Sequence, residues 1–376
     1  MIKVAFIIDT IESPTAGTEK QLLMLIKNLD RSRFAPTLFV LHSSSWLKHH
    51  FDLCPLVVID FTSFFAFSSY RRLKSFIDTL KREGFDCLQT HFIDSNIVGI
   101  ISAKAAGVPH IISSRRDQGY WHTPVKLFIF KFLNKWVNSF VANCQATATW
   151  ASITEAISSE RIKVIYNGIE LESFSPRLSS ERHEVRGEIG LLDSSIVVVI
   201  VANLRAVKQI DTFLQAAALV RLRLGDAKFL VIGDGDLRED LEKLALQLGI
   251  SGETTFLGKR TDVPRILSAC DVAVLSSASE SFSNSIVEYF ASGLPVVSTD
   301  VGGCREIIVD GINGYVVPPS DYKTMADRIC ELAVNVDMEG MRQINIEKAK
   351  NLFSKEIMVA TFERLYAEGT EGTHLK

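Results

Sequence analysis

Two glutamates lie eight positions apart around the predicted start of a helix. Glu280 and Glu288 belong to the stretch "SASESFSNSIVEYFASG", which runs from Ser277 to Gly293. The preceding run "DVAVLSS" predicts a buried strand, and apolar residues at helical spacing from Ile286 onward predict a helix that Gly293 ends. The sequence therefore places the carboxylates where a strand gives way to a helix.

A helix start of this kind can bind a particular class of ligand. Its first N–H groups lack helical partners and carry the positive end of the helix dipole, so they attract phosphate. The flanking carboxylates accept hydrogen bonds from sugar hydroxyls. Together they suit a nucleotide-sugar, in which a diphosphate lies between two sugar rings. The alternative is that Glu280 and Glu288 are only capping charges, and their spacing alone does not separate the two.

A basic loop follows another predicted strand. The segment "SSIVVVIVANLRAVK" carries Arg205 and Lys208 just after its apolar run. Two cations three positions apart can neutralise a pyrophosphate without a metal ion, although a solvated loop is the alternative. No cluster in the sequence has metal-ligand spacing, and the Asp-Gly-Asp of "GDGD" (233–236) is interpreted as a turn. We expect neither a metal nor another cofactor besides the nucleotide-sugar donor.

Apolar strands alternate with amphipathic helices in two successive blocks, as in doubly wound parallel sheets. A chain of 376 residues also favours two domains. We predict an α/β fold with domains at 1–176 and 194–353, joined by a linker near 176–194, and a ligand site in the cleft between them. A final helix (354–376) packs back on either domain, with its apolar side formed by Ile357, Thr361, Phe362 and Tyr366.

Charge and composition exclude several classes of protein. The first 176 residues carry 19 Lys and Arg against 15 Asp and Glu, whereas the remainder carries 22 against 29. The first part is therefore only weakly basic, which argues against a nucleic-acid partner. Six scattered cysteines indicate reduced thiols. No apolar run is long enough to span a bilayer, and the N-terminus resembles a buried strand more than a signal peptide, so we expect a cytoplasmic protein.

The full run "SASESFSNSIVEYFASGLPVVSTDVGGCREIIVDGINGYVVPPSD" resembles the donor-binding region of retaining glycosyltransferases of family 4. The segments "GTEKQLLMLIKNL", "VIYNGIELESF" and "VANLRAVKQIDTFLQAA" match in the same order. The resemblance implies the GT-B fold, in which two Rossmann-like domains face each other across a cleft. It covers residues 195–320 almost continuously and the first half in patches.

The resemblance also implies roles for particular residues. Arg205 and Lys208 would bind the donor diphosphate, and Glu280 a hydroxyl of the transferred sugar, so these three form the predicted catalytic set. Glu288 would accept from the ribose hydroxyls. The remaining predicted donor-binding positions are Arg260 near the base, Gly17 as a close-approach glycine, and the backbone N–H groups of Phe282, Ser283, Asn284 and Ser285.

The sequence departs from the family pattern in both halves. Ser281 and Ser283 stand where relatives often have Gly or Pro, and Ala16-Gly17 retains one glycine of an expected pair. The family's histidine after "HIISS" is replaced by Arg115, Arg116 and Asp117. We expect this cluster to contact the acceptor or diphosphate in the cleft, the alternative being a self-neutralising surface pair. His91, at another strand end, is an acceptor-side candidate or a structural histidine.

Two apolar segments of the first half also carry basic residues. "PVKLFIFKFLNKWVNSF" (124–140) is either a buried helix or a lipid-facing surface, and "FTSFFAFSSYRR" (61–72) places aromatics beside Arg71 and Arg72. Apolar groups beside cations suit an anionic membrane surface or a lipid-linked acceptor. This suggests a peripheral position on the inner face of the cytoplasmic membrane.

We therefore expect a metal-independent retaining glycosyltransferase. It would move a hexose-type sugar from a nucleotide-sugar, a UDP-sugar in our interpretation, to a glycan or lipid-linked glycan in bacterial polysaccharide or lipopolysaccharide biosynthesis. The alternatives are a sugar-nucleotide epimerase or hydrolase on the same plan, and a non-catalytic nucleotide-sugar-binding module. The sequence has no P-loop and no GxGxxG after its first strand, which disfavours hydride transfer.

Overall fold

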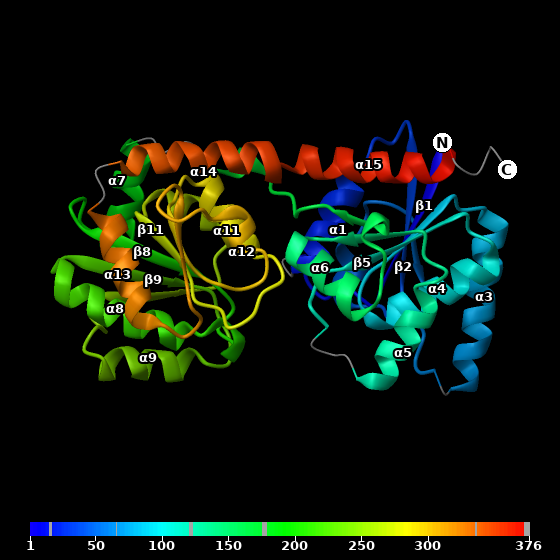
Figure 1. The fold of residues 1–376 in the computed structure, drawn as a ribbon, viewed down its shortest axis with the longest axis horizontal. Helices are drawn as coiled ribbons and strands as arrows, with labels where there is room; N and C mark the ends of the chain where they lie inside the picture. The colour runs from blue at the N-terminus through cyan, green and yellow to red at the C-terminus, as the bar shows by residue number, and fades with distance from the viewer. Residues whose placement is uncertain (15–16, 65, 120–122, 175–178, 335–336, 372–376) are drawn as a thin grey trace. The chain divides into compact units, whose positions relative to one another are not determined.

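The computed structural model describes residues 1–14, 17–64, 66–119, 123–174, 179–334 and 337–371 (Figure 1). The chain divides into two compact units. Unit 1 combines Met1–Gly168 with Lys355–Lys376, and unit 2 is Ile169–Ser354. Each unit has its own parallel sheet and its own core, and we describe each by itself.

The sheet of unit 1 has seven parallel strands in the order β3-β2-β1-β4-β5-β6-β7. Its continuous apolar runs are buried on both faces, which is why they form internal strands of a parallel sheet. In β1, for example, Val4 to Ile8 are all fully buried. The strands are β1 (Ile2–Ile8), β2 (Phe34–Val40), β3 (Leu56–Val58), β4 (Cys87–Thr90), β5 (His110–Arg115), β6 (Ser139–Ala142) and β7 (Ile162–Val164).

Helices cover both faces of this sheet. Alternate residues of β1 point to opposite sides, so Phe6 belongs to a core cluster with residues of α1, α2 and α15, whereas Ile7 belongs to one with residues of α3, α4, α5 and α6. The helices are α1 (Gly17–Asn28), α2 (Ser45–His50), α3 (Phe67–Glu83), α4 (Ile93–Ala106), α5 (Pro124–Leu133), α6 (Gln145–Thr154) and α15 (Lys355–Glu371).

The C-terminal helix α15 belongs to unit 1. Phe362 and Tyr366 of the predicted apolar side are buried against α1 and the sheet, and the Tyr366 hydroxyl donates to Gln89. Ile357 is 39% exposed, so the buried side of the helix differs in part from the predicted one. Its members are Met358, Val359, Phe362, Leu365 and Tyr366.

The sheet of unit 2 has six parallel strands in the order β10-β9-β8-β11-β12-β13. The strands are β8 (Ile196–Val201), β9 (Ala227–Ile232), β10 (Thr254–Gly258), β11 (Val272–Leu275), β12 (Val296–Thr299) and β13 (Gly314–Val317). The helices are α7 (Ser179–Glu188), α8 (Ile210–Leu224), α9 (Arg238–Gln247), α10 (Val263–Ser268), α11 (Asn284–Ala291), α12 (Cys304–Ile307), α13 (Tyr322–Ala333) and α14 (Met338–Phe353).

The segment expected to be a linker contains a helix of unit 2. Arg186 of α7 is fully buried, and its guanidinium donates to Asp271 at 2.7 Å and to the carbonyls of Leu192, Asp193 and Ser195. A buried guanidinium is tolerated only when its donors are satisfied. These bonds therefore fix α7 to the amino end of β11.

Both sheets reverse their strand order at one point. In unit 1 the reversal lies between β1 and β4, and in unit 2 between β8 and β11. The connections leaving such a pair diverge to opposite faces, so the carboxyl ends of the pair form the usual ligand site of an open α/β sheet. Most of the predicted site residues follow these strand ends, whereas Arg260 follows β10 and the Arg115–Asp117 segment lies at the end of β5.

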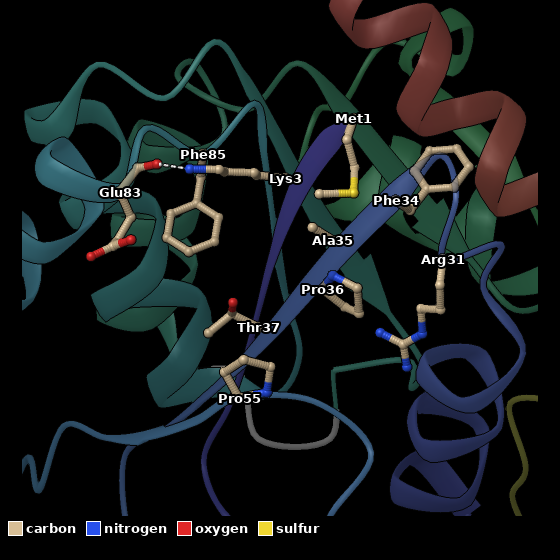
Figure 2. Close-up of a pocket in the computed structure, with 10 residues that line it drawn as sticks. All are labelled: Met1, Lys3, Arg31, Phe34, Ala35, Pro36, Thr37, Pro55, Glu83 and Phe85. Carbon is tan, nitrogen blue, oxygen red and sulfur yellow. Dashed lines mark hydrogen bonds between the residues drawn. The ribbon is translucent and has the colours of Figure 1, made fainter.

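A pocket of about 320 Å³ in unit 1 lies at the other edge of its sheet (Figure 2). Figure 2 shows Lys3, Pro36 and Pro55 around it, which belong to or precede the amino ends of β1, β2 and β3. The Lys3 ammonium donates to the carbonyl of Glu83. This pocket is thus remote from the strand ends that carry the candidate residues of unit 1.

Candidate functional site

Lys208 and Glu280 meet at the switch point of unit 2. Lys208 ends the short turn after β8, and Glu280 lies in the connection from β11 to α11. The ammonium Nζ of Lys208 lies 2.5 Å from Oε1 of Glu280, and the side chains are 25% and 13% exposed. The structure thus joins two residues that lie 72 positions apart in the sequence.

Two serines at the end of β11 fix this pair. The Ser277 hydroxyl donates to Oε1 of Glu280 at 2.7 Å, and the Ser276 hydroxyl donates to the Lys208 carbonyl at 2.8 Å. The N–H of Ala278 donates to the carbonyl of Val207. The loops after β8 and β11 are therefore tied together by main-chain and side-chain bonds, and the ion pair is held in a defined place.

Gly302 allows the loop after β12 to support Glu280. Its φ is +52°, and a Cβ there would lie 2.3 Å from the carbonyl oxygens of both Glu280 and Ser281. The neighbouring N–H of Gly303 donates to the carbonyl of Ser281 at 2.8 Å. Only glycine combines this backbone conformation with so close an approach. The sequence analysis missed this contact, and the pair "GG" in the run "DVGGCRE" is the signal that could have indicated it.

The N-terminal end of α11 lies beside Glu280. Ser283 occupies the N-cap position, but its side chain caps no backbone N–H of the helix, and its hydroxyl instead bonds to the Ser285 hydroxyl at 2.8 Å. The preceding Phe282 is buried and packs against Phe353, with ring centroids 5.6 Å apart. The first N–H groups of α11 are thus held in place without a side-chain cap.

Glu288 lies one turn further along α11. It is half-buried and shares a helix face with Asn284 and Ser285, whereas Ile286, Val287 and Phe290 are buried in unit 2. The helix therefore turns its polar face away from the core of unit 2.

The two arginines predicted in unit 2 differ in their surroundings. Arg205 is exposed, and within the described residues its guanidinium makes no hydrogen bond or ion pair. Arg260 instead forms a two-bond ion pair with Asp262, at 2.8 and 2.6 Å, and this pairing raises its pKa. Arg260 follows β10, two strands from β8, so it lies at the same sheet edge but apart from Lys208 and Glu280.

His91 follows β4 at the switch point of unit 1. Its side chain is fully buried, and neither ring nitrogen has a hydrogen-bond partner among the described residues. Burial, together with the charge of Arg116, holds its pKa well below the ordinary value, so the ring is neutral. The next residue, Phe92, has a φ of +65°, a conformation that costs free energy for a side chain of this size.

Arg116 lies near His91 and near the start of α1. Its Nη1 donates to Asn167 at 2.9 Å, its Nε has no partner in the described structure, and burial lowers its pKa to about 10 despite the nearby carboxyl of Glu19. Burial also raises the pKa of Glu19, in the first turn of α1. Gly17 is the exposed first residue of that helix, whereas Ala16 lies outside the described residues. We call His91, Arg116, Glu19 and Asn167 the unit 1 cluster.

Arg115 requires a correction, because it is not open to a ligand. It is 4% exposed, and its guanidinium donates to Glu155, Ser113 and Asn134 while lying over the rings of Phe130 and Phe140. Its neighbour Asp117 accepts from the N–H of Gly119 at 2.7 Å. The expected Arg–Arg–Asp cluster is therefore divided, since Arg115 points into the core while Arg116 stays at the strand end.

Comparison with known proteins places the chain in a family. A family described as Glycosyltransferase Family 4 matches residues 15–173, and one described as Glycosyl transferases group 1 matches residues 195–335. The chain is a family 4 glycosyltransferase. The two matches cover most of both units, including every candidate position named above, and they confirm the resemblance seen in the sequence.

Solved structures confirm the GT-B fold of this glycosyltransferase. HepE of Anabaena, solved in complex with UDP, superposes with a TM-score of 0.86 at 22% identity, over 98% of this chain and 100% of that one. The lipopolysaccharide outer core galactosyltransferase WaaB gives a TM-score of 0.76 at 18% identity, over 98% and 100%.

Among curated proteins, the glycosyltransferase is similar to one from Escherichia coli named UDP-Gal:alpha-D-GlcNAc-diphosphoundecaprenol alpha-1,3-galactosyltransferase. The two are 26% identical over 310 residues, which is 79% of each chain. The N,N'-diacetylbacillosaminyl-diphospho-undecaprenol alpha-1,3-N-acetylgalactosaminyltransferase of Campylobacter jejuni is 26% identical over 299 residues, 76% of this chain and 78% of that one. Both names describe transfer to a lipid-linked acceptor.

Proposed function

We propose that this glycosyltransferase moves a hexose-type sugar from a UDP-sugar to a glycan or lipid-linked glycan, with retention of anomeric configuration. The observation that carries the proposal is the Lys208–Glu280 pair at the switch point of unit 2, beside the uncapped start of α11 and the exposed Arg205. Cations and helix N–H groups suit a diphosphate, and a fixed carboxylate suits sugar hydroxyls. The UDP named for HepE and the E. coli relative supports the choice of nucleotide.

In this scheme each residue of the unit 2 site binds a different part of the donor. Arg205 and Lys208 stabilise the negative charge that grows on the diphosphate as the glycosidic bond to it breaks, which is commonly the largest catalytic effect. Glu280 accepts from a hydroxyl of the sugar and keeps Lys208 oriented, while Glu288 accepts from the ribose. The acceptor hydroxyl attacks from the face the diphosphate leaves, and a phosphate oxygen takes its proton. We propose that the two cations serve this step without a metal ion, so transfer should persist in EDTA.

Unit 1 takes the acceptor in this scheme. Its cluster offers two half-buried groups, the guanidinium of Arg116, whose Nε has no partner in the described part of the chain, and the carboxyl of Glu19, whereas His91 is fully buried and does not itself reach a ligand. Such groups suit the hydroxyl and phosphate groups of a lipid-linked glycan. Two curated relatives are named for diphosphoundecaprenol-linked acceptors, which supports a role in bacterial polysaccharide or lipopolysaccharide biosynthesis.

Replacing Lys208 by alanine tests the donor site. Lys208→Ala should lower kcat by about 10²–10³ fold, because one preorganised charge opposite the leaving group is lost. The rate of sugar transfer is measured under single-turnover conditions, with the UDP-sugar that raises the melting temperature of the protein most. Lys243→Ala is the matched control, because Lys243 is also a lysine of unit 2 paired with a carboxylate, Asp240, but lies exposed on α9.

Near-normal turnover in Lys208→Ala, with the fold intact, would remove Lys208 from the mechanism. A reaction of the wild type with donor alone separates the other possibilities. Epimer or free sugar formed faster than transfer would indicate an epimerase or hydrolase, and donor binding without turnover on any acceptor would indicate a binding module.

A further inference from the structure

Helix α5 presents an apolar stripe to solvent. Val125, Phe128, Ile129 and Phe132 recur at the spacing that places side chains on one face of a helix, and they are 68%, 74%, 36% and 50% exposed. Such a stripe normally faces the core. In α5 the core side is formed by other residues, Phe130 and Leu133, so the helix is apolar on both sides. The prediction of a buried helix in segment 124–140 therefore holds for one side of α5 only, and the lipid-facing interpretation remains a prediction.

A second exposed group lies at the start of α3. Phe64, Phe67 and Tyr70 are 50%, 73% and 67% exposed. Helix α3 follows β3 and α5 follows β5, so both helices begin at the carboxyl edge of the unit 1 sheet, and α4 packs against both. Figure 1 shows the starts of α3 and α5 at the lower margin of unit 1. We call these seven residues the α3–α5 surface.

Positive charge accompanies this surface. The sequence contains no Asp or Glu from 118 to 154 or from 61 to 77. Lys126 and Lys131 flank the α5 stripe on either side, as 100° per residue places them. Two further cations lie over exposed rings, Lys135 over Phe132 at 5.9 Å and Arg71 over Phe67 at 5.2 Å. Cations beside exposed aromatic rings are typical of segments that lie in the headgroup region of an anionic bilayer.

We propose that the α3–α5 surface binds an anionic lipid bilayer, with its aromatic and aliphatic side chains among the acyl boundary and its lysines and Arg71 at the headgroups. A second copy of the chain fits less well, because a two-fold contact through this surface would bring like charges together. Among the described residues no helix is long and apolar enough to span a membrane, so such binding would be peripheral.

This inference rests on α3 and α5 and not on the proposed function. It does have a consequence for that function, because the unit 1 cluster lies at the same carboxyl edge of the sheet. Docking through α3 and α5 would hold this edge towards the bilayer, where a lipid-linked acceptor carries its glycan.

Vesicle flotation of the full chain tests the proposal. The wild type should float with vesicles of phosphatidylcholine and phosphatidylglycerol in equal amounts, and much less with phosphatidylcholine alone. Raising salt from about 0.1 M to about 1 M should weaken binding, because the screening length shortens about threefold. The double variant Val125→Ser/Phe128→Ser should bind at least about tenfold more weakly, because two large apolar contacts are lost.

Leu222→Ser/Leu246→Ser is the matched control, since these leucines of unit 2 are 82% and 68% exposed and should not affect flotation. The proposal is overturned if the wild type stays with the unbound fraction, if it floats equally on neutral vesicles, or if both double variants behave alike. A dimer that Val125→Ser/Phe128→Ser dissolves in sedimentation velocity would assign the surface to a second copy instead. The rise in melting temperature on adding UDP, measured on the same variants, shows independently whether the donor site is intact.

Discussion

At the scale of single residues, this glycosyltransferase uses ion pairs in two different ways. The Arg115–Glu155 pair of unit 1 is almost completely buried, and every partner of the guanidinium lies in the core. The Lys208–Glu280 pair of unit 2 remains partly exposed at a strand end. A buried pair cannot be separated without leaving a desolvated charge, whereas a partly exposed one can exchange partners with a ligand. This difference separates a structural arginine from the lysine that we propose to bind the donor.

Removing one charge of the buried pair should destabilise the protein strongly. Glu155→Gln leaves the Arg115 guanidinium unpaired in the core, which should lower the free energy of unfolding by about 3–5 kcal/mol. Asp327→Asn removes the partner of Arg223 at the surface, and should cost about 0–1 kcal/mol. Urea denaturation of both variants measures the difference. Equal, small effects would show that Arg115 does not depend on Glu155.

His91 should make stability depend on pH. Its folded pKa lies well below the roughly 6.5 of an unfolded histidine, because burial and Arg116 oppose its charge. Below about pH 6.5 the unfolded chain therefore binds a proton that the folded chain does not bind. The free energy of unfolding should fall with decreasing pH, by up to about 1.4 kcal/mol per pH unit for each such histidine.

His110, whose pKa burial also lowers, contributes in the same direction. His91→Gln should thus reduce the slope of stability against pH between about pH 6.5 and 5.5, where histidine titrates in the unfolded chain. Urea denaturation at several pH values measures this slope. An unchanged slope in His91→Gln would mean that the imidazole takes up a proton in the folded state.

At the scale of elements, the connections after the strands position the chemistry. Glu280 is held from three sides, by Ser277 in its own loop, by Lys208 from the loop after β8, and by Gly302 from the loop after β12. None of these residues lies in an α-helix or a strand. The sheet supplies only the common edge at which the three loops meet.

Gly302→Ala should therefore damage the site more than the fold. The added Cβ would meet two carbonyl oxygens in a left-handed conformation, with an expected cost of about 1–3 kcal/mol and a displaced Glu280. We expect transfer to fall at least about tenfold, as one 1.4 kcal/mol step in transition-state stabilisation would give. Gly252→Ala is the control, because open space surrounds its Cβ position, and its effect should stay within about 1 kcal/mol. Steady-state kinetics and thermal unfolding compare the two.

At the scale of the whole molecule, the chain returns to its first unit. After unit 2 ends at Ser354, α15 completes the core of unit 1 with its buried side chains. Unit 1 is thus built from both ends of the sequence. Its stability consequently depends on residues that follow unit 2 in the sequence.

Deleting residues 355–376 should unfold unit 1 and spare unit 2. Five buried side chains of α15 are lost, at about 1.5–3 kcal/mol each, which is comparable to the whole stability of a domain. The remaining protein should show one cooperative thermal transition that UDP still raises. Deleting only 372–376 removes no part of α15 and serves as the control. A variant that lacks residues 355–376 but retains the native circular dichroism spectrum and a thermal transition for each unit would contradict the role given to α15.

The sequence by itself determined the fold class and most of the strands. Continuous apolar runs such as Val4–Ile8 and Ile196–Val201 are typical of strands buried on both faces of a parallel sheet, and the motif around Glu280 and Glu288 was sufficient to indicate the family. Periodicity is local, so it can be recognised without knowledge of distant neighbours.

Tertiary structure alone decided what each charged or aromatic side chain meets. Arg115 and Arg116 are adjacent and chemically identical, yet Arg115, the last residue of β5, points into the core, whereas Arg116, just beyond the strand, bonds to Asn167. Lys208 lies beside Glu280 because the strands that precede them, β8 and β11, are neighbours in the sheet. The second apolar face of α5 is exposed because Phe130 and Leu133 form the side of the helix that packs in the core. Such partnerships join residues far apart in the sequence, so no local pattern records them.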